Sequence, residues 1–153
     1  MSSVRRGAAV AQRYLVSLYF IGVIVQFFLV GVGLFGMKAG STIDNAKSLD
    51  PHRGFGFILI DFVGGLLLIV TLIAWQSPLR QKVGLYVLLC LLGVLQATLA
   101  TEGFHHKYVG MFHPVNALIL LGLSGTLARR SWLEARSAQA ATTESTPATT
   151  GVD

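Results

Sequence analysis

The sequence predicts an all-α membrane protein whose four transmembrane helices form an up-down-up-down bundle. Of its 153 residues, 53% are hydrophobic and only 12% are charged, which is too apolar for a soluble domain of this size. Basic residues cluster at the ends of the apolar runs, as the positive-inside rule requires. Four such runs make a single transmembrane domain, 14–136, with helices expected at about 14–37, 51–75, 83–101 and 113–130.

The first expected helix, 14–37, follows a basic N-terminal segment, 1–13. Its 24 residues exceed the apolar core of a secretory signal, about 7–15 residues, so we expect it to be retained as a span. The second helix, about 51–75, follows a polar loop. Proline suits a first helical turn, so this helix is expected to begin near Asp50 or Pro51, with Asp50 as its N-cap.

The segment 75–82 is short and basic, as expected of a cytoplasmic turn between antiparallel helices. The third helix, 83–101, leads through an outer loop to the fourth, 113–130. Because this last run is short for a span, we expect its helix to continue, with Trp132 at the membrane interface. The segment 137–153 has almost no large apolar residue, which predicts a disordered cytoplasmic tail.

Lysine and arginine positions predict the orientation. The two termini and the turn between the second and third helices hold eight basic residues, whereas the other two loops hold four. This excess predicts that both termini are cytoplasmic and that the histidine-bearing loops lie outside a bacterial inner membrane. The expected partners are the lipid bilayer and either another membrane protein or further copies of the chain. Since the basic residues lie at span ends, no nucleic-acid partner is expected.

A weak internal repeat divides the chain into two helical hairpins. The first hairpin has Gln26 in its first helix and His52 at the start of its second. The second hairpin repeats this order with Gln96 and His113. The pattern predicts a 2+2 arrangement of related hairpins.

His52 and His113 are the leading candidate site. They open the second and fourth helices at the same depth, and these helices are diagonal neighbours in the predicted bundle, so their imidazoles are placed to hold one haem. Arg53 is placed to neutralise a haem propionate, and Asn116 to hydrogen-bond a ligand. Gly56 lies one turn after His52 and would leave space for the macrocycle. The alternative, which the residues leave open, is that both histidines are simply hydrated at the membrane boundary.

Short motifs around these histidines carry a resemblance. The His52-Arg53 pair followed by Gly54, and the Leu95-Gln96 pair, resemble the His-Arg and Leu-Gln motifs of haem A synthase. The segment 14–128 resembles one four-helix half of that enzyme, which implies a haem on the outer side. The whole chain resembles still more closely an uncharacterised family of small bacterial four-helix membrane proteins, from which no activity carries over. That second resemblance rests on Gln26, His52-Arg53-Gly54, Gln96 and His113-Pro114-x-Asn116.

A second set of candidate ligands shares the predicted outer surface. Imidazole and carboxylate groups suit zinc or copper. Two of these histidines are adjacent on a loop and have no fixed ligand geometry, so ordinary solvent-exposed histidines are the simpler explanation. The set comprises Asp50, His52, Glu102, His105, His106 and His113.

Asp61 lies inside the second helix, about 13 Å below His52 and turned away from it. A carboxylate at this depth is costly and usually marks function. Gln26, at comparable depth in the first helix, is its expected hydrogen-bond partner, forming an intramembrane polar pair. The alternatives are a proton-carrying acid, as in a small transporter, or an acid that contacts a quinone.

Small residues are frequent inside the predicted spans, where they let helices approach closely. For Gly65 and Gly125, contact with another subunit is an equal alternative. The single cysteine, Cys90, excludes an intrachain disulfide and is expected to be a small buried residue. No nucleophile elbow, phosphate-binding loop or metalloprotease motif occurs, which favours a role other than catalysis. The sequence therefore predicts a haem b protein for electron transfer or haem handling, or else a non-catalytic membrane subunit or scaffold.

Overall fold

The computed structural model describes residues 3–74 and 80–144, and every regular element in these ranges is a helix. Four helices are long and apolar enough to cross a membrane, which confirms the predicted all-α class with four candidate spans. By this criterion the candidate spans are Ser3–Phe35, Lys47–Ala74, Val83–Gly103 and Lys107–Ala141.

The first helix, α1, runs over Ser3–Phe35 and contains 33 residues. It begins well before the expected start at Tyr14, because the alanine, arginine and glutamine residues that precede the apolar run are good helix formers. At about 1.5 Å per residue the helix is about 50 Å long, so it exceeds the roughly 30 Å hydrocarbon core of a bilayer.

The second span is one continuous rod with three kinds of helical turn. The 3-10 helix η1, Lys47–Leu49, leads directly into α2, Asp50–Phe57. A seven-residue π-helix, η2, covers Ile58–Gly64 and passes into α3, Gly65–Ala74. The wider π-helical turn was not predicted, and such turns occur frequently at functional sites.

The expected N-cap role of Asp50 is wrong. The N-cap position belongs to Leu49, whose backbone is already helical because the 3-10 turn of η1 precedes it. Asp50 lies within the first turn and forms an ion pair with Arg53 at 2.8 Å. The pair is solvent-exposed, so its contribution to stability is small.

The second half of the chain contains α4, Arg80–Gly103, the short α5, Lys107–Gly110, and α6, Phe112–Glu144. The α6 helix continues beyond the apolar run, as expected, but it also enters the segment 137–153, for which disorder was predicted. Alanine-rich sequence explains the extension, since alanine has the highest helix propensity. The rest of that predicted tail, and most of the predicted turn 75–82, lie outside the described residues.

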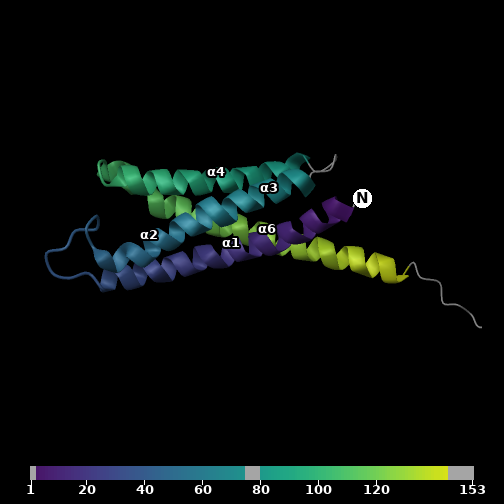
Figure 1. Cartoon of the computed structure of the whole chain (residues 1–153), viewed down its shortest axis with the longest axis horizontal. Coiled ribbons are helices and arrows are strands. Elements are labelled where there is room, and N and C mark those ends of the chain that lie inside the picture. The colour runs from purple at the N-terminus through teal and green to yellow at the C-terminus, as the bar shows by residue number, and fades with distance from the viewer. Residues whose placement is uncertain (1–2, 75–79, 145–153) are drawn as a thin grey trace, which may run out of the picture.

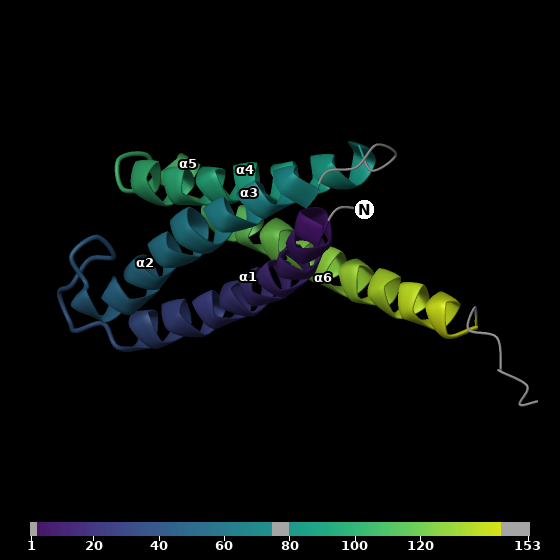
Figure 2. The same ribbon diagram turned by 45° about the vertical axis from the view of Figure 1, so that its right-hand side comes forward.

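Each helix of the bundle packs against two others. The α1 helix contacts the rod α2–η2–α3 on one side and α6 on the other, while α4 contacts η2, α3 and α6. The loops that follow α1 and α4 lie at the same end of the structure (Figure 1). We call this the histidine end, comprising residues 36–57 and 101–113. The N-terminus and the long extension of α6 lie toward the opposite end (Figures 1 and 2).

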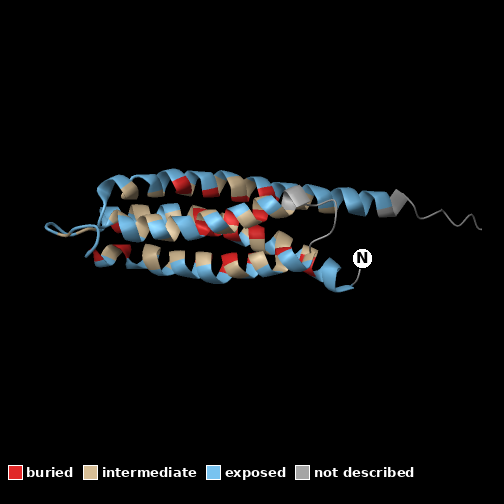
Figure 3. Ribbon diagram, turned by 90° about the horizontal axis from the view of Figure 1, so that it is seen from above, coloured by how far each residue is buried: buried red, intermediate tan, exposed pale blue. Residues whose placement is uncertain are grey.

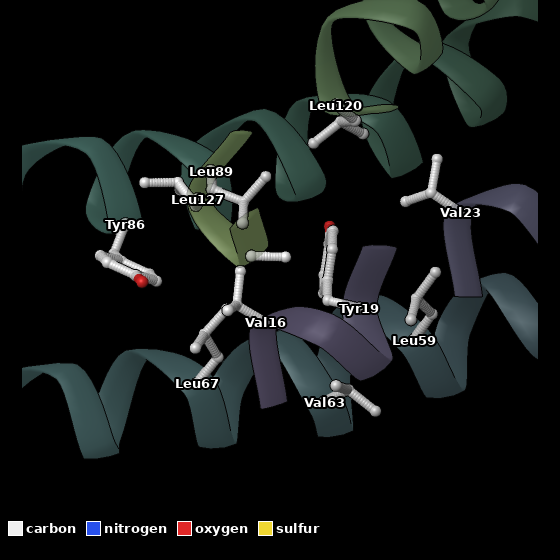
Figure 4. Close-up of a cluster of buried hydrophobic side chains, with 11 residues drawn as sticks. Val16, Tyr19, Val23, Leu59, Val63, Leu67, Tyr86, Leu89, Leu120 and Leu127 are labelled. Carbon is white, nitrogen blue, oxygen red and sulfur yellow. The ribbon is translucent and has the colours of Figure 1, made fainter. Parts of the chain in front are cut away.

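Buried side chains concentrate in the middle of the bundle, whereas exposed residues dominate its ends (Figure 3). All four long helical segments contribute to one buried apolar cluster (Figure 4). This cluster lies in the middle of the bundle, next to the histidine end, and its side chains fill the space between the helices. Its members are Val16, Tyr19, Val23, Leu59, Val63, Leu67, Tyr86, Leu89, Leu120, Leu127 and Ala128.

Two glycines allow the chain to turn tightly between α4 and α5. A Cβ atom at Gly103 would lie 2.7 Å from the Cα of Gly110, and one at Gly110 would lie 3.0 Å from the Cα of Gly103. Because the opposing atoms belong to the backbone, no side-chain rotation could relieve the overlap. The close approach therefore requires glycine, and it sets where α6 and His113 begin.

Gly103→Ala is expected to lower the free energy of unfolding by about 1–3 kcal/mol, the usual cost of overpacking. Gly122→Ala is the matched control, because a Cβ at Gly122 meets nothing within 4 Å in the described chain. The control should be neutral or slightly stabilising, since alanine favours helix. Denaturant titration of the protein in detergent micelles measures both, and equal losses in the two variants would contradict the backbone explanation.

Candidate functional site

A cavity of about 850 Å³ lies among the four helices at the histidine end. Buried apolar residues of the cluster, including Leu59 and Leu120, form its inner wall, and Asp44, Arg53 and Lys107 line its outer part. A cavity of this size suits a small molecule or cofactor. Six of the eight predicted site residues line it: Gln26, His52, Arg53, Gly56, Gln96 and His113.

The structure brings His52 and His113 together across the bundle. Their ring centroids are 6.4 Å apart and their planes make an angle of 83°. Both side chains are half-buried. The Nδ1 atom of His52 is fully buried and has no hydrogen-bond partner within the described chain. Neighbouring protein atoms cover this nitrogen, so a ligand in the cavity could reach it only if the ring turned.

His113 is held in one orientation by Gln96 of α4. Its Nδ1 lies 3.1 Å from the backbone oxygen of Gln96, which can only accept, so Nδ1 carries the proton. Its Nε2 lies 3.1 Å from the side-chain nitrogen of Gln96 and accepts from it. His113 is thus a neutral imidazole, and Gln96 occupies both of its ring nitrogens.

Asn116 does not line the cavity, contrary to its predicted role as a ligand contact. It is buried between α4 and α6, where its Nδ2 donates to the Leu92 carbonyl at 2.9 Å and to the Gln96 Oε1 at 2.8 Å. Asn116 therefore acts on the site through Gln96. It fixes the side-chain amide that in turn donates to His113.

Gly56 faces the side chain of Gln26 and not open space. A Cβ atom at position 56 would lie 2.6 Å from the Nε2 of Gln26. The Oε1 of Gln26 is buried and lacks a hydrogen-bond partner among the described residues. The absence of a side chain at Gly56 therefore leaves space, as predicted, but the amide of Gln26 fills it. The Oε1 of that amide remains without a hydrogen-bond donor in the described chain.

Arg53 connects the site to the loop after α1. Its guanidinium donates to the backbone oxygens of Ile43, Asp44 and Ala46 and forms the ion pair with Asp50. The same loop holds Asp44, where the Thr42 hydroxyl donates to the carboxylate and lowers the pKa of Asp44 below its usual value. Arg53 thus fastens the loop over the cavity while lining it.

Asp61 and Gln26 are not brought together. Asp61 is exposed on the outer face of η2 and lines no part of the cavity, as its turn away from His52 predicts. Gln26 instead extends toward Gly56. The two residues lie at similar depths along their helices. Their side chains nevertheless point in different directions around the helix axes, and the π-helical turn changes the direction for Asp61.

The predicted outer metal set is not assembled either. In residues 3–74 and 80–144, no group of three or more histidine, cysteine, aspartate or glutamate side chains is placed to hold a metal ion. His105 and His106 are exposed, and their backbone amides donate to the Glu102 carbonyl in the turn after α4. This turn points their side chains away from the cavity, whose lining includes neither.

Tyr19 and Lys107 also line the cavity but were not predicted as site residues. Tyr19 is 1% exposed, and its hydroxyl lies 2.7 Å from the position a Cβ would take at Gly93. A tyrosine within an apolar span and a glycine in a facing span were the available signals. Neither signal alone distinguishes a cavity wall from ordinary packing, because buried tyrosines are common.

The two histidines lie close together, but they are not arranged as a pair of haem ligands: Gln96 hydrogen-bonds both ring nitrogens of His113, and the Nδ1 of His52 is covered by protein atoms. Imidazoles that bind one metal from opposite sides through nitrogens at about 2 Å have ring centres about 6 Å apart. Metal-binding histidines commonly donate their second nitrogen to a carbonyl oxygen, as His113 does to Gln96. Binding at the Nε2 of His113 would require the Gln96 amide to turn away. The chain matches no protein-family model, no curated protein and no solved structure.

Proposed function

We propose that this chain is an integral membrane, b-type cytochrome-like protein that binds one haem between His52 and His113, for electron transfer or haem handling. The observation that carries the proposal is the meeting of two imidazoles from different helices, 6.4 Å apart, at a cavity of about 850 Å³. The Nδ1 of His52 supports it further, because a buried polar atom without a partner is costly and a turn of the ring toward a ligand in the cavity would relieve that cost.

The residues around the two histidines have distinct proposed roles. Gln96 fixes the tautomer of His113 through its backbone oxygen, and Asn116 positions Gln96. Lys107 provides positive charge at the outer part of the cavity, where the propionates of a haem would be neutralised, and Arg53 would add to it only by leaving Asp50. When bound, a haem supplies a one-electron couple whose potential depends on its axial ligands. No catalytic group is part of this proposal.

We also propose the membrane arrangement that this function needs. The four spans form an up-down-up-down bundle of two related hairpins, with both termini in the cytoplasm and the histidine end outside the inner membrane. The distribution of lysine and arginine supports this orientation. The common end shared by the loops after α1 and α4 supports the antiparallel order.

The absorption spectrum of the detergent-purified protein, oxidised and then reduced, tests the proposed function. We expect a Soret band that shifts on reduction, with the paired visible bands of a low-spin haem. If the protein is isolated without haem, titration with haemin should saturate at about one haem per chain. No Soret band after purification, together with no saturable uptake of haemin, would overturn the proposal.

A non-catalytic membrane subunit or scaffold is the second candidate, and the position of Asp61 favours it. An exposed acid on the outer face of a candidate span indicates that a further protein chain, either a second copy or a different protein, covers this face. Such a subunit would bind no haemin and would purify as a stable complex. The same absorption and purification experiment therefore distinguishes the two functions.

A further inference from the structure

Asp61 lies on the outer surface of the second candidate span, within the π-helix η2. Its neighbours on this surface are large apolar side chains, including Ile58, 59% exposed, and Phe62, 70% exposed. Such a surface faces hydrocarbon in a membrane, and a carboxyl group there needs a hydrogen-bond partner. Counted from His52, Asp61 is about 13 Å inside the span, too deep for water or lipid headgroups to serve.

The chain itself offers Asp61 no partner in its described part, where no side chain donates to the carboxylate. The exposed threonine hydroxyls on the other spans already have acceptors, and the exposed tyrosines, Tyr14 and Tyr108, lie nearer the ends of the bundle than Asp61. Thr98, Thr101 and Thr126 each donate to a carbonyl oxygen one turn earlier in their own helix. If a second copy docked through one of those surfaces, Asp61 would therefore remain unpaired.

Two glycines on the same rod support close contact at this surface. A Cβ atom at Gly54 or at Gly65 would meet nothing within 4 Å in the described chain, so packing inside the bundle does not require either glycine. Gly65 lies one turn after Asp61, and small residues let membrane helices approach closely. Gly125, the other glycine considered for subunit contact, packs against Phe20 of its own chain instead.

We propose that the surface formed by Gly54, Ile58, Asp61, Gly65 and Ile69 is the contact between two copies of this chain in the membrane. A two-fold axis near Asp61 brings the two carboxyl groups together, where the O–H of one carboxyl can donate to an oxygen of the other. A symmetric dimer is the commonest assembly of identical chains, and it pairs Asp61 with its own copy.

The dimer surface is separate from the candidate haem site. Asp61 does not line the cavity, whose described lining residues all belong to a single chain. The proposal therefore does not depend on haem binding, and failure of either proposal would leave the other standing.

Cysteine cross-linking in native membranes tests the surface directly. In a Cys90→Ala background, Ile58→Cys and Ile69→Cys are expected to form disulfide-linked dimers on mild oxidation. Leu91→Cys on α4 and Leu118→Cys on α6 are the controls. At 61% and 60% they are as exposed as Ile58 and Ile69, at 59% and 55%. Cross-linking of the controls to the same extent would overturn the proposal.

The role of Asp61 is tested by the dimer dissociation constant in lipid vesicles, measured by energy transfer between labelled chains at several protein-to-lipid ratios. Asp61→Leu should weaken the dimer about tenfold, the size expected for one hydrogen bond between membrane helices. Asp61→Asn should largely preserve the dimer, because two asparagine amides can both donate and accept.

Gly65→Leu should also weaken the dimer, by blocking close approach, whereas Gly122→Leu on α6 should not. A Cβ atom at either glycine meets nothing within 4 Å in the described chain, and unchanged helical circular dichroism verifies that the larger leucine side chains leave the fold intact. A monomer at every protein-to-lipid ratio would overturn the proposal. A dimer whose dissociation constant is unchanged by Asp61→Leu would also overturn it. So would a different protein that co-purifies with this chain only when Asp61 is present.

Discussion

Substitution of His52 or His113 by alanine is expected to remove haem from the purified protein, lowering the Soret absorbance per chain at least about tenfold. Each imidazole would supply one axial ligand, and the two rings meet at the cavity from different helices. Loss of either ring leaves the macrocycle held mainly by apolar contacts. Absorbance of matched preparations, oxidised and reduced, measures the loss.

His105→Ala and His106→Ala provide the matched controls, since both residues are exposed histidines at the same end of the molecule. These variants should keep the full spectrum. His52→Gly with added imidazole separates ligand loss from misfolding, because the free base can restore the missing ligand only in a folded cavity. A Soret band unchanged in the His52→Ala, His113→Ala double variant would refute the assignment.

The spans and the convergence of the candidate site at one end were predictable from the sequence, and both have simple physical causes. Apolar runs of membrane length must form helices, since lipid offers no partner for backbone amides. Short polar segments between these runs reverse the direction of the chain. His52 and His113, each at the start of an apolar run, therefore lie at the same end of the bundle. Depth along a helix follows directly from residue number.

Rotation about the helix axes was not predictable in the same way. Gln26 and Asp61 lie at similar depths, but their positions in the sequence do not determine which neighbouring helix each side chain faces. The π-helix η2 adds to the difficulty, because its wider turns change the angular position of every residue within it. Asp61 consequently faces outward, and Gln26 occupies the space beside Gly56.

The helix ends show the same distinction between local and tertiary causes. Asp50 followed by Pro51 is a typical N-terminal pattern, but the preceding 3-10 turn moves the cap to Leu49. The α6 helix outlasts its apolar run because its alanine-rich continuation favours helix without any packing. The segment 137–153 has almost no large apolar residues, and this composition alone predicted disorder.

Asn116→Leu is expected to lower the free energy of unfolding by about 1–3 kcal/mol, the cost of leaving a buried polar group without its partner. Asn116 is 4% exposed, and both of its donors are used, one by Leu92 and one by Gln96. Leucine has the same branching at Cγ but cannot donate to the Gln96 Oε1. Thr126→Val, which removes an exposed hydroxyl bonded within its own helix, should change stability by less than about 0.5 kcal/mol.

The same substitution should also weaken haem binding, although Asn116 does not line the cavity. Without Asn116 the Gln96 amide loses its anchor, and Gln96 is the residue that orients His113. The effects of Asn116→Leu and Gln96→Leu on haem affinity should therefore overlap, so that the double variant loses little more than Gln96→Leu alone. Strictly additive losses would mean that Asn116 acts on the site by another route. Haemin titration of the four proteins, with unfolding measured on the same samples, separates this positioning role from a general loss of stability.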